Sequence, residues 1–408
     1  MNKKIIIFGG GTVSHIKNHL ALCAPAYGST AKRINELIDR DERFDNFDLE
    51  VKLTKMAGGP LLETNDDIEE ACRDLINDST TKIIIMSAAL CDYEPESDFR
   101  NYGKYEGRFN TAEDLSIELT LIPAPKIISE IRKKRKDIFL VGFKTTCGKT
   151  EDEQYLAGLN LCKTASCNLV VANDTKTRLN MVITPEEARY HVTKDRDVVL
   201  KGMLDIMWHR SHLTFTRSTV IDGKPIPWDS DLIPNSLKTV VNYCISQHAY
   251  KPFNGVTAGH FACKLDDTTF LSSIRKTNFN KLNNVGLVKV KTDGPDTVLA
   301  YGAKPSVGGQ SQRIVFRDHP GMDCIVHFHC EKKQKSQVPT VSQREYECGS
   351  MGCGENTSKG LKEFGNLKAV YLDNHGPNIV FNRNISPMEV IAFIEENFDL
   401  DSKTGGLV

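Results

Sequence analysis

The sequence predicts an α/β protein with two domains, the first built on a mostly parallel sheet and the second on a mostly antiparallel sheet. The chain has 408 residues, more than a single compact core usually holds. Up to about residue 210, short β-branched runs alternate with amphipathic stretches, the pattern of a parallel sheet covered by helices. Residues 211–234 are interrupted by Gly and Pro, and beyond them strands between Gly and Asp turns predominate. We therefore expect domains at residues 1–210 and 235–408, with a linker at 211–234.

In the first half, apolar runs predict the strands and amphipathic runs the helices. The strands are expected at residues 4–8, 49–53, 83–86, 138–141 and 168–172. The helices are expected at residues 30–40, 66–76, 126–136 and 198–209. The third helix ends in a basic run at 132–136, which favours the C-terminal end of the helix dipole. A nucleic-acid patch is the alternative, but the run has no interleaved aromatic residues.

The second half is expected to begin with a helix at residues 236–248 and to end with one at 387–398. Strands are expected between them at residues 259–264, 269–272, 285–291, 324–329 and 369–372. The Gly and Asp turns that separate these runs favour antiparallel pairing over a second doubly wound sheet.

The composition argues against several classes of protein. Lys and Arg number 52 against 53 Asp and Glu, a formal net charge of −1, whereas a general nucleic-acid binder should show a basic excess. No apolar run approaches the roughly 20 residues that cross a bilayer, and the first residues do not read as a secretory signal. The 12 cysteines have no framework spacing, so we expect reduced thiols and a cytoplasmic protein. We expect no nucleic-acid partner and no membrane partner.

Two glycine-rich stretches approach phosphate-binding loops without matching them. Residues 9–14 follow the first strand, but Ser14 stands where a dinucleotide fingerprint has its third glycine. Free backbone N–H groups in such a loop suit a phosphate, and a tight turn without a ligand is the alternative. Residues 142–150 imitate a Walker loop, but the spacing is one residue too long and Cys147 replaces the second glycine. A nicotinamide oxidoreductase is therefore the least favoured function.

Four motifs follow one another in residues 1–205, namely residues 10–12, 87–93, 141–143 and 171–174. Together they resemble the synthetase domain of phosphopantothenate–cysteine ligase. The resemblance implies a Rossmann-like three-layer domain in which CTP or ATP with Mg²⁺ activates a carboxylate for attack by an amine. It also implies a nucleotide cleft at the strand ends, formed by Gly10, Gly11, Thr12, Ala88, Asp92, Lys104, Phe143, Asn173 and Asp174.

Two residues of this implied cleft have specific roles by the same resemblance. Asp92 would accept hydrogen bonds from ribose hydroxyls, with an ordinary strand-end turn as the alternative. Lys104 would face the triphosphate, since phosphates need positively charged donors, and is also a catalytic candidate.

The loop that would hold the acid substrate departs from the ligase family. The family has an Asn closely followed by Ser-Ser-Gly, and Asn18 is the matching Asn and a catalytic candidate. Residues 20–28 after it are neither Ser-Ser-Gly nor similarly polar. Such a loop lacks the hydroxyl and amide donors of the family, so a nucleotide site is retained while the pantothenate substrate is in question.

Three histidines in the second half have the spacing of a catalytic metal site. His327 and His329 flank Phe328, and strand alternation places both imidazoles on one face. His375 follows another strand in an Asn-His-Gly turn. Three neutral imidazoles with an open fourth position are typical of catalytic zinc, so Zn²⁺ or another divalent metal is expected. A solvated strand face or a degenerate site without metal is the alternative.

Residues 257–261, 320–323 and 374–376 accompany these histidines. With them, residues 235–400 resemble the class II aldolase and adducin head family. The resemblance implies an α/β/α domain, a Lewis-acid metal that stabilises an enediolate, and a phosphorylated sugar-like or hydroxy-acid substrate. It also implies the substrate-binding positions Gly259, His260, Ser272 and Ser273. Arg275 is a catalytic candidate that could pair with a phosphate or carboxylate.

The carboxylate of this second family is missing. The family carries Ser-Ser-Glu some twenty residues before the His-x-His, whereas residues 305–311 hold no acid. Proton abstraction must then come from elsewhere or the reaction differs. The acids nearest in sequence are Glu331, Glu345 and Glu347, and none has specific support.

We predict a two-domain enzyme in which a nucleotide-dependent, ligase-like domain is fused to a zinc-dependent, aldolase-type lyase. Its partners would be a small phosphorylated substrate and a nucleotide. The alternative is a non-catalytic binding or assembly protein that keeps both folds and has lost both chemistries. Both resembled families form oligomers, so a homo-oligomer is expected.

Overall fold

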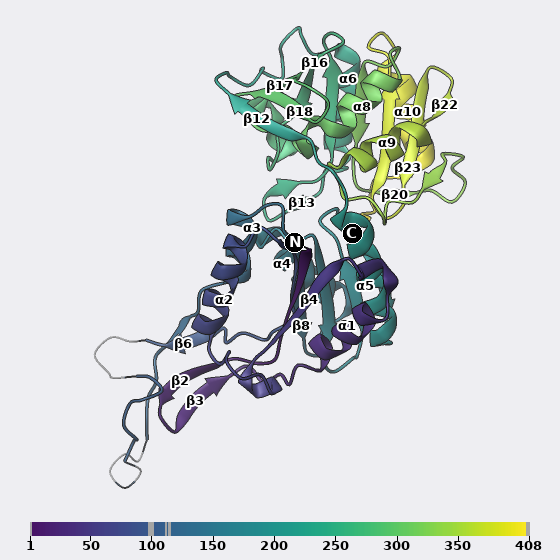
Figure 1. The fold of residues 1–408 in the computed structure, drawn as a ribbon. Helices are drawn as coiled ribbons and strands as arrows, with labels where there is room; N and C mark the ends of the chain where they lie inside the picture. The colour runs from purple at the N-terminus through teal and green to yellow at the C-terminus, as the bar shows by residue number, and fades with distance from the viewer. Residues whose placement is uncertain (1, 97–101, 111, 113–115, 405–408) are drawn as a thin grey trace. The chain divides into compact units, whose positions relative to one another are not determined.

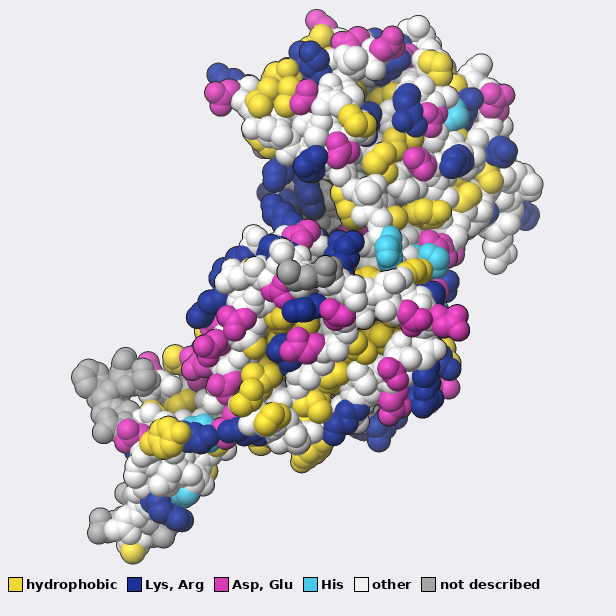
Figure 2. All heavy atoms as spheres, in the orientation of Figure 1, with side chains coloured by type: hydrophobic (Ala, Val, Ile, Leu, Met, Phe, Trp, Pro, Cys, Tyr) yellow, Lys and Arg dark blue, Asp and Glu magenta, His cyan; other side chains and the backbone are white. Residues whose placement is uncertain are grey.

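The computed structural model describes residues 2–96, 102–110, 112 and 116–404. The chain divides into two compact units (Figure 1). The first comprises Met1–Pro185 and Tyr190–Ser211, and the second comprises Glu186–Arg189 and His212–Val408. Acidic and basic side chains are interspersed on the visible face of each unit (Figure 2), and the formal net charge of the chain is −1. None of the helices in the described ranges has the length and apolar character of a membrane span.

A seven-stranded sheet forms the centre of the first unit, in the order β11-β10-β9-β8-β5-β1-β4. Its strands are β1 (Lys3–Gly9), β4 (Phe47–Leu53), β5 (Thr81–Met86), β8 (Phe139–Thr146), β9 (Leu169–Asp174), β10 (Asn180–Ile183) and β11 (Arg189–Thr193). The strands from β4 to β9 in this order are parallel, and β10 pairs antiparallel with β9. The predicted mostly parallel sheet is therefore confirmed.

Helices cover both faces of this sheet (Figure 1). They are α1 (Ser29–Asp39), α2 (Asn65–Asn77), α3 (Ile128–Lys134), α4 (Glu151–Thr164) and α5 (Arg196–Ser211). The connection through α1 runs along the sheet in one direction, and the connections through α2, α3 and α4 run in the other. Because such crossovers are right-handed, α1 lies on one face and the other three on the opposite face. α5 contacts α1, which completes a three-layer unit.

The first unit also contains short elements outside its main sheet. Two antiparallel ribbons follow the ends of central strands, and two single-turn helices lie on either side of β4. They are β2 (Val13–Lys17) with β3 (Leu20–Cys23), β6 (Tyr93–Pro95) with β7 (Leu121–Pro123), and the 3-10 helices η1 (Glu42–Phe44) and η2 (Lys55–Ala57).

A ten-stranded sheet forms the centre of the second unit, in the order β12-β18-β17-β16-β15-β19-β24-β23-β21, with β22 also paired to β23. Its strands are β12 (Arg217–Ile221), β15 (His260–Lys264), β16 (Thr269–Ser273), β17 (Leu287–Thr292), β18 (Thr297–Tyr301), β19 (Cys324–His327), β21 (Thr340–Val341), β22 (Lys362–Phe364), β23 (Leu367–Leu372) and β24 (Gly376–Phe381). Only β12–β18 and β21–β23 pair in parallel within it. The predicted mostly antiparallel sheet is confirmed.

Each face of this second sheet carries a pair of helices over its own apolar core. α6 (Asn235–Ser246) packs with α10 (Pro387–Asn397) on the core that contains Phe261 and Phe328, and α8 (Gln310–Asp318) packs with α9 (Met351–Gly360) on the core that contains Phe270. The remaining elements are α7 (Leu282–Val285), η3 (Phe279–Lys281), η4 (Ser306–Gly309), β13 (Pro252–Phe253), β14 (Val256–Thr257), β20 (Glu331–Lys332) and β25 (Phe398–Asp399). The unit is thus an α/β/α sandwich, as expected.

Some element boundaries differ from the sequence-based expectation. The expected linker at 211–234 contains β12, a full strand of the second sheet. The strand expected at 285–291 begins only at Leu287, because α7 extends to Val285. The strand expected at 324–329 ends at His327.

Candidate functional site

The three predicted histidines lie together at the ends of neighbouring strands of the second sheet. β19 ends at His327, and His329 follows two residues later, while Phe328 between them enters the core. His375 lies in the turn between β23 and β24, and β24 is the neighbour of β19. The three side chains are buried, and their nearest ligand atoms lie within 4.8 Å of one another.

A glycine allows the turn of His375 to approach β19. Gly376 has φ +137°, and a Cβ there would lie 2.1 Å from the carbonyl oxygen of Phe328. Asn374 precedes the histidine in the left-handed region, at φ 54°, which Asn tolerates better than most residues. The Asn-His-Gly motif therefore has a geometric reason: both neighbours of His375 permit backbone conformations that bring its ring to His327.

The hydrogen bonds of His327 fix where its proton lies. Nδ1 of His327 is 2.7 Å from the carbonyl oxygen of Pro377. A carbonyl oxygen only accepts, so Nδ1 carries the proton and Nε2 keeps a lone pair. Burial, together with the neighbouring His260 and His329, holds the pKa of His327 well below its usual range, so the ring is neutral.

The Nε2 atoms of His327 and His375 lie 3.2 Å apart. Zinc–nitrogen bonds of about 2.0–2.1 Å at a tetrahedral angle set two ligand nitrogens about 3.3 Å apart, so this separation fits a shared ion. Three imidazoles are also a donor set that suits zinc and similar divalent metals. An Nε2–H···Nε2 hydrogen bond between the two rings is the ordinary alternative.

A fourth histidine, His260, lies beside this cluster. It is paired with His327 across the β15–β19 ladder, and the two ring centroids are 4.9 Å apart. Burial, and secondly the nearby His329, lowers the pKa of His260 to about 3. Its neutral ring therefore offers one N–H donor and one acceptor nitrogen. The structure thus brings one predicted substrate-binding residue next to the predicted ligands.

The other predicted substrate-binding residues lie around the same strand ends, where Ser272 and Ser273 are buried and Gly259 is partly buried. Gly259 has φ +101°, and a Cβ there would meet the carbonyl oxygen of His327 at 2.5 Å. Ser273 donates to Oγ of Ser306 at 2.9 Å, and Ser272 donates to the carbonyl oxygen of Ser273 at 3.3 Å. Arg275, by contrast, is exposed. Among the described residues, its side chain has no buried partner that would support the predicted catalytic role.

An acid that the sequence analysis did not single out lies next to the cluster. Glu187 belongs to the segment Glu186–Arg189, which groups with the second unit. Its Oε2 lies 3.5 Å from Nδ1 of His329 and 3.0 Å from Nζ of Lys403. Of the acids that are near in sequence, Glu331 is exposed and Glu345 accepts a hydrogen bond from Ser342.

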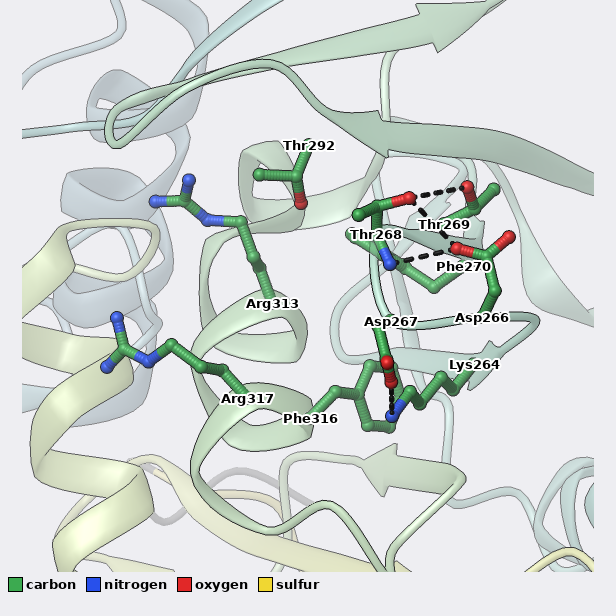
Figure 3. A pocket seen from close by; sticks show the side chains of 10 residues that line it. All are labelled: Lys264, Asp266, Asp267, Thr268, Thr269, Phe270, Thr292, Arg313, Phe316 and Arg317. Atoms are coloured by element: carbon green, nitrogen blue, oxygen red, sulfur yellow. Dashed lines mark hydrogen bonds and ion pairs between the residues drawn. The ribbon is translucent and has the colours of Figure 1, made fainter.

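A small surface pocket of the second unit contains several charged side chains (Figure 3). Its lining includes Lys264, Asp267, Arg313 and Arg317. Lys264 pairs with Asp267 at 2.8 Å, and Arg313 donates to the carbonyl oxygens of residues 294 and 295. The free space of about 20 Å³ holds about one water molecule, so this pocket does not suit a sugar-sized ligand.

In the first unit, the predicted nucleotide-binding residues gather at the carboxyl ends of the parallel strands. Gly10, Gly11 and Thr12 follow β1, and Ala88 follows β5. Two backbone hydrogen bonds join these two loops. The N–H of Thr12 donates to the carbonyl oxygen of Ala89 at 3.0 Å, and the N–H of Ala89 donates to the carbonyl oxygen of Gly10 at 2.9 Å.

Two further predicted residues of the cleft occupy the neighbouring strands. Phe143 is half-buried on β8, and Asn173 is the penultimate residue of β9, where its Oδ1 accepts from the hydroxyl of Thr145 at 3.2 Å. These positions share the sheet edge at which open α/β sheets bind ligands.

The charged residues predicted for this cleft have protein partners. Lys104 donates to the carboxylate of Glu63. Asp92 is exposed and pairs with Lys126 at 2.5 Å. Asp174 is buried and accepts from the N–H groups of residues 148, 149, 176 and 177 and from Oγ1 of Thr146. Burial alone would raise the pKa of Asp174, but these donors outweigh it and hold the pKa well below its usual range. A low pKa is typical of a carboxylate that accepts several backbone hydrogen bonds.

Asn18 lies at the exposed turn between β2 and β3. Its Oδ1 is 3.1 Å from Nδ1 of His19, and its N–H donates to the carbonyl oxygen of Glu106 at 3.1 Å. The residues after it, where the ligase family has Ser-Ser-Gly, form β3 of this ribbon. A paired strand thus replaces the polar loop.

Comparison with known protein families identifies both halves of the chain. Residues 55–201 match the family model of the DNA/pantothenate metabolism flavoprotein C-terminal domain. Residues 239–386 match the model of the class II aldolase and adducin N-terminal domain. The chain is therefore a fusion of a phosphopantothenate–cysteine ligase-like domain with a class II aldolase-like domain, which confirms both predicted resemblances.

Individual relatives cover one half or the other. The coenzyme A biosynthesis bifunctional protein CoaBC of Thermococcus kodakarensis is 31% identical over 115 residues, which are 28% of this chain and 27% of that protein. The chain thus spans about a quarter of the length of this relative. The DNA/pantothenate metabolism flavoprotein of Streptococcus pneumoniae is 21% identical, covers 50% of this chain and 97% of its own, and gives a TM-score of 0.41. L-fuculose 1-phosphate aldolase is 15% identical, covers 41% of this chain and 85% of its own, and gives a TM-score of 0.31.

Proposed function

We propose that the second unit is the catalytic part of a metal-dependent lyase of class II aldolase type, in which His327, His329 and His375 hold Zn²⁺ or another divalent metal. The observation that carries the proposal is the 3.2 Å separation of the Nε2 atoms of His327 and His375. Because Nδ1 of His327 donates to Pro377, its Nε2 faces the other ring with a lone pair. When bound, the metal supplies a Lewis acid for negative charge that develops on a substrate oxygen.

The side chains around the metal site have roles of their own in this proposal. The carbonyl oxygen of Pro377 holds His327 in one tautomer and one orientation. Burial of the cluster excludes water and strengthens its electrostatic interactions. His260 offers a neutral donor to a substrate oxygen, and Gly259 lets the chain pass close to β19. The substrate class we propose is a phosphorylated sugar-like molecule or a hydroxy acid.

For the first unit, we propose a nucleotide cleft for CTP or ATP with Mg²⁺ that serves a ligase-like activity. The shared edge formed by the loops after β1 and β5 and by the ends of β8 and β9 supports this proposal. Because β3 replaces the polar substrate loop, we propose no particular acid as the substrate of this activity. We further propose a cytoplasmic homo-oligomer, for which the scattered free thiols and the analogy with both families are the support.

Metal content tests the proposal for the second unit. We expect the purified full-length chain to contain about one zinc ion per chain by plasma mass spectrometry, and the His375→Ala variant to lose it, because two imidazoles do not complete a tetrahedral site. The control is His248→Asn, since His248 is an exposed histidine of the same unit whose left-handed backbone Asn tolerates.

Two results would contradict this expectation. One is a folded wild-type chain that stays metal-free after titration with zinc. The other is zinc that remains bound in His375→Ala. The first result favours the non-catalytic alternative, in which both folds serve binding or assembly, and the second shows that His375 is not a required ligand.

A further inference from the structure

The carboxylate of Glu187 and the ammonium group of Lys403 form a buried ion pair beside the histidine cluster. Their side chains are 3% and 8% exposed, and the two charged atoms lie 3.0 Å apart. Removing two such charges from water is unfavourable, and their mutual attraction compensates for it only with good geometry and additional partners. Packing alone therefore gives no reason to place this pair here.

The backbone at Glu187 is strained as well. Its φ is +71°, in the left-handed region that non-glycine residues rarely adopt. Such a conformation is unfavourable and persists only where the surroundings determine it, commonly at functional sites. Here the strained residue is the one whose carboxylate reaches the cluster.

The C-terminal segment that carries Lys403 is fixed by hydrogen bonds. Nζ of Lys251 donates to the carbonyl oxygens of Leu400 at 2.8 Å and Asp401 at 2.7 Å, and also to that of Ser402. Oγ of Ser402 accepts from the N–H of Glu331 at 2.8 Å. These contacts bring the Lys403 ammonium to Glu187, where it compensates the buried negative charge.

A ring nitrogen of the cluster also lies close to the carboxylate of Glu187. Oε2 of Glu187 lies 3.5 Å from Nδ1 of His329. A histidine that gives the Nε2 lone pair to a metal carries its proton on Nδ1, and a carboxylate facing that proton fixes the tautomer, orients the ring and makes the ligand more basic. The carbonyl oxygen of Pro377 has this role at His327, at the shorter distance of 2.7 Å.

We propose that Glu187, held by Lys403, is a positioning residue that orients His329 so that its Nε2 faces the Nε2 atoms of His327 and His375. The proposal rests on the metal site proposed above and adds to it a residue from a distant part of the sequence. Glu187 acts through His329, so its removal weakens metal binding without removing a ligand.

Metal affinity measured on the full-length chain tests this role. We expect Glu187→Gln to bind Zn²⁺ and Co²⁺ about 10- to 100-fold more weakly in chelator competition, the usual effect of losing such a partner. The visible absorption of bound Co²⁺ should shift in energy and intensity, a change that a purely structural role would not produce. The matched control is Glu363→Gln, which alters an exposed acid of the same unit that pairs with Lys368, and it should keep the wild-type affinity and spectrum.

A double variant separates positioning from misfolding, because Glu187→Gln alone leaves the Lys403 ammonium buried opposite a neutral group. In Glu187→Gln/Lys403→Met both charges are absent, and we expect the fold to be kept and the metal affinity to stay as low as in Glu187→Gln. A double variant with wild-type affinity and spectrum overturns the proposal. The proposal is also overturned if the wild type binds one metal ion and Glu187→Gln binds it equally tightly. A wild-type chain that binds no metal overturns the proposed function and this role together.

Discussion

Glu63 illustrates how single charged residues are used in the first unit. Its carboxylate accepts hydrogen bonds from Lys104 and from Lys55, the latter at 2.8 Å, and these donors lower the pKa of Glu63 from 4.5 to about 2. Between these two pH values the folded chain binds fewer protons than the unfolded chain. The stabilisation is therefore fully present above about pH 4.5 and is lost as the pH falls towards 2.

We expect Glu63→Gln to lower the free energy of unfolding of the first unit at pH 6 by up to about 1 kcal/mol, since the pairs are partly exposed. This difference in stability between the variant and the wild type should shrink as the pH falls from 4.5 to 2. Trp208 fluorescence measures this in a Trp228→Phe background, because the chain has two tryptophans and Trp208 alone lies in the first unit. Glu70→Gln removes an exposed acid of α2 and serves as the control. A deficit that stays constant over this pH range would contradict the assignment.

Residues that depend on local periodicity could be predicted, and those that depend on distant contacts could not. The trio of His327, His329 and His375 followed from strand alternation and a turn motif, both of which are local. Glu187 carries no such signal, because its partners His329 and Lys403 are distant in sequence. The resemblance to the ligase family implied Asp174 in the cleft, but N–H groups of two loops enclose its carboxylate.

At the scale of elements, the turn between β23 and β24 has the strictest sequence requirement. A Cβ at Gly376 would lie 2.1 Å from the carbonyl oxygen of Phe328, at a φ that side chains rarely adopt. We expect Gly376→Ala to destabilise the second unit by about 2–4 kcal/mol, the sum of backbone strain and overpacking. The measurement is denaturant unfolding followed by Trp228 fluorescence in a Trp208→Phe background.

Metal affinity should fall in the same Gly376→Ala variant, because the turn carries His375. Gly321→Ala is the matched control, since nothing lies within 4 Å of a Cβ at that position. Equal stability of the two variants would show that the turn can shift away from β19 without cost.

The parallel strands of the first half were predicted, whereas helices α4 and α8 were not. Every strand expected in the first half exists: the central parallel strands are continuous apolar runs, and the edge strand β4 shows alternating apolar and charged residues. The buried face of α4, by contrast, includes Gln154 and Gly158 beside its apolar residues. Likewise α8 buries Gln310 and Gln312. Polar and small residues on a buried face weaken the apolar periodicity by which a helix is recognised.

At the scale of the whole molecule, each unit has its own sheet and core. A ligand stabilises the state that binds it, by about 2.7 kcal/mol at a hundredfold excess over its dissociation constant. We therefore expect zinc to shift the unfolding of the second unit, seen by Trp228, and CTP or ATP with Mg²⁺ to shift that of the first, seen by Trp208. The check is unfolding of the two single-tryptophan variants with each ligand. If neither nucleotide shifts the Trp208 transition at millimolar concentration, the proposed cleft is wrong.

The position of β12 limits where a recombinant fragment of the second unit can begin. β12 lies at one edge of the second sheet and pairs with β18 from Arg217 to Ile221. A recombinant fragment that starts at residue 235 would leave the backbone N–H and C=O groups of β18 without this neighbour, and bare strand edges recruit other chains. A fragment that begins near residue 212 would keep this strand but would lack Glu187, the partner of Lys403 beside the histidine cluster.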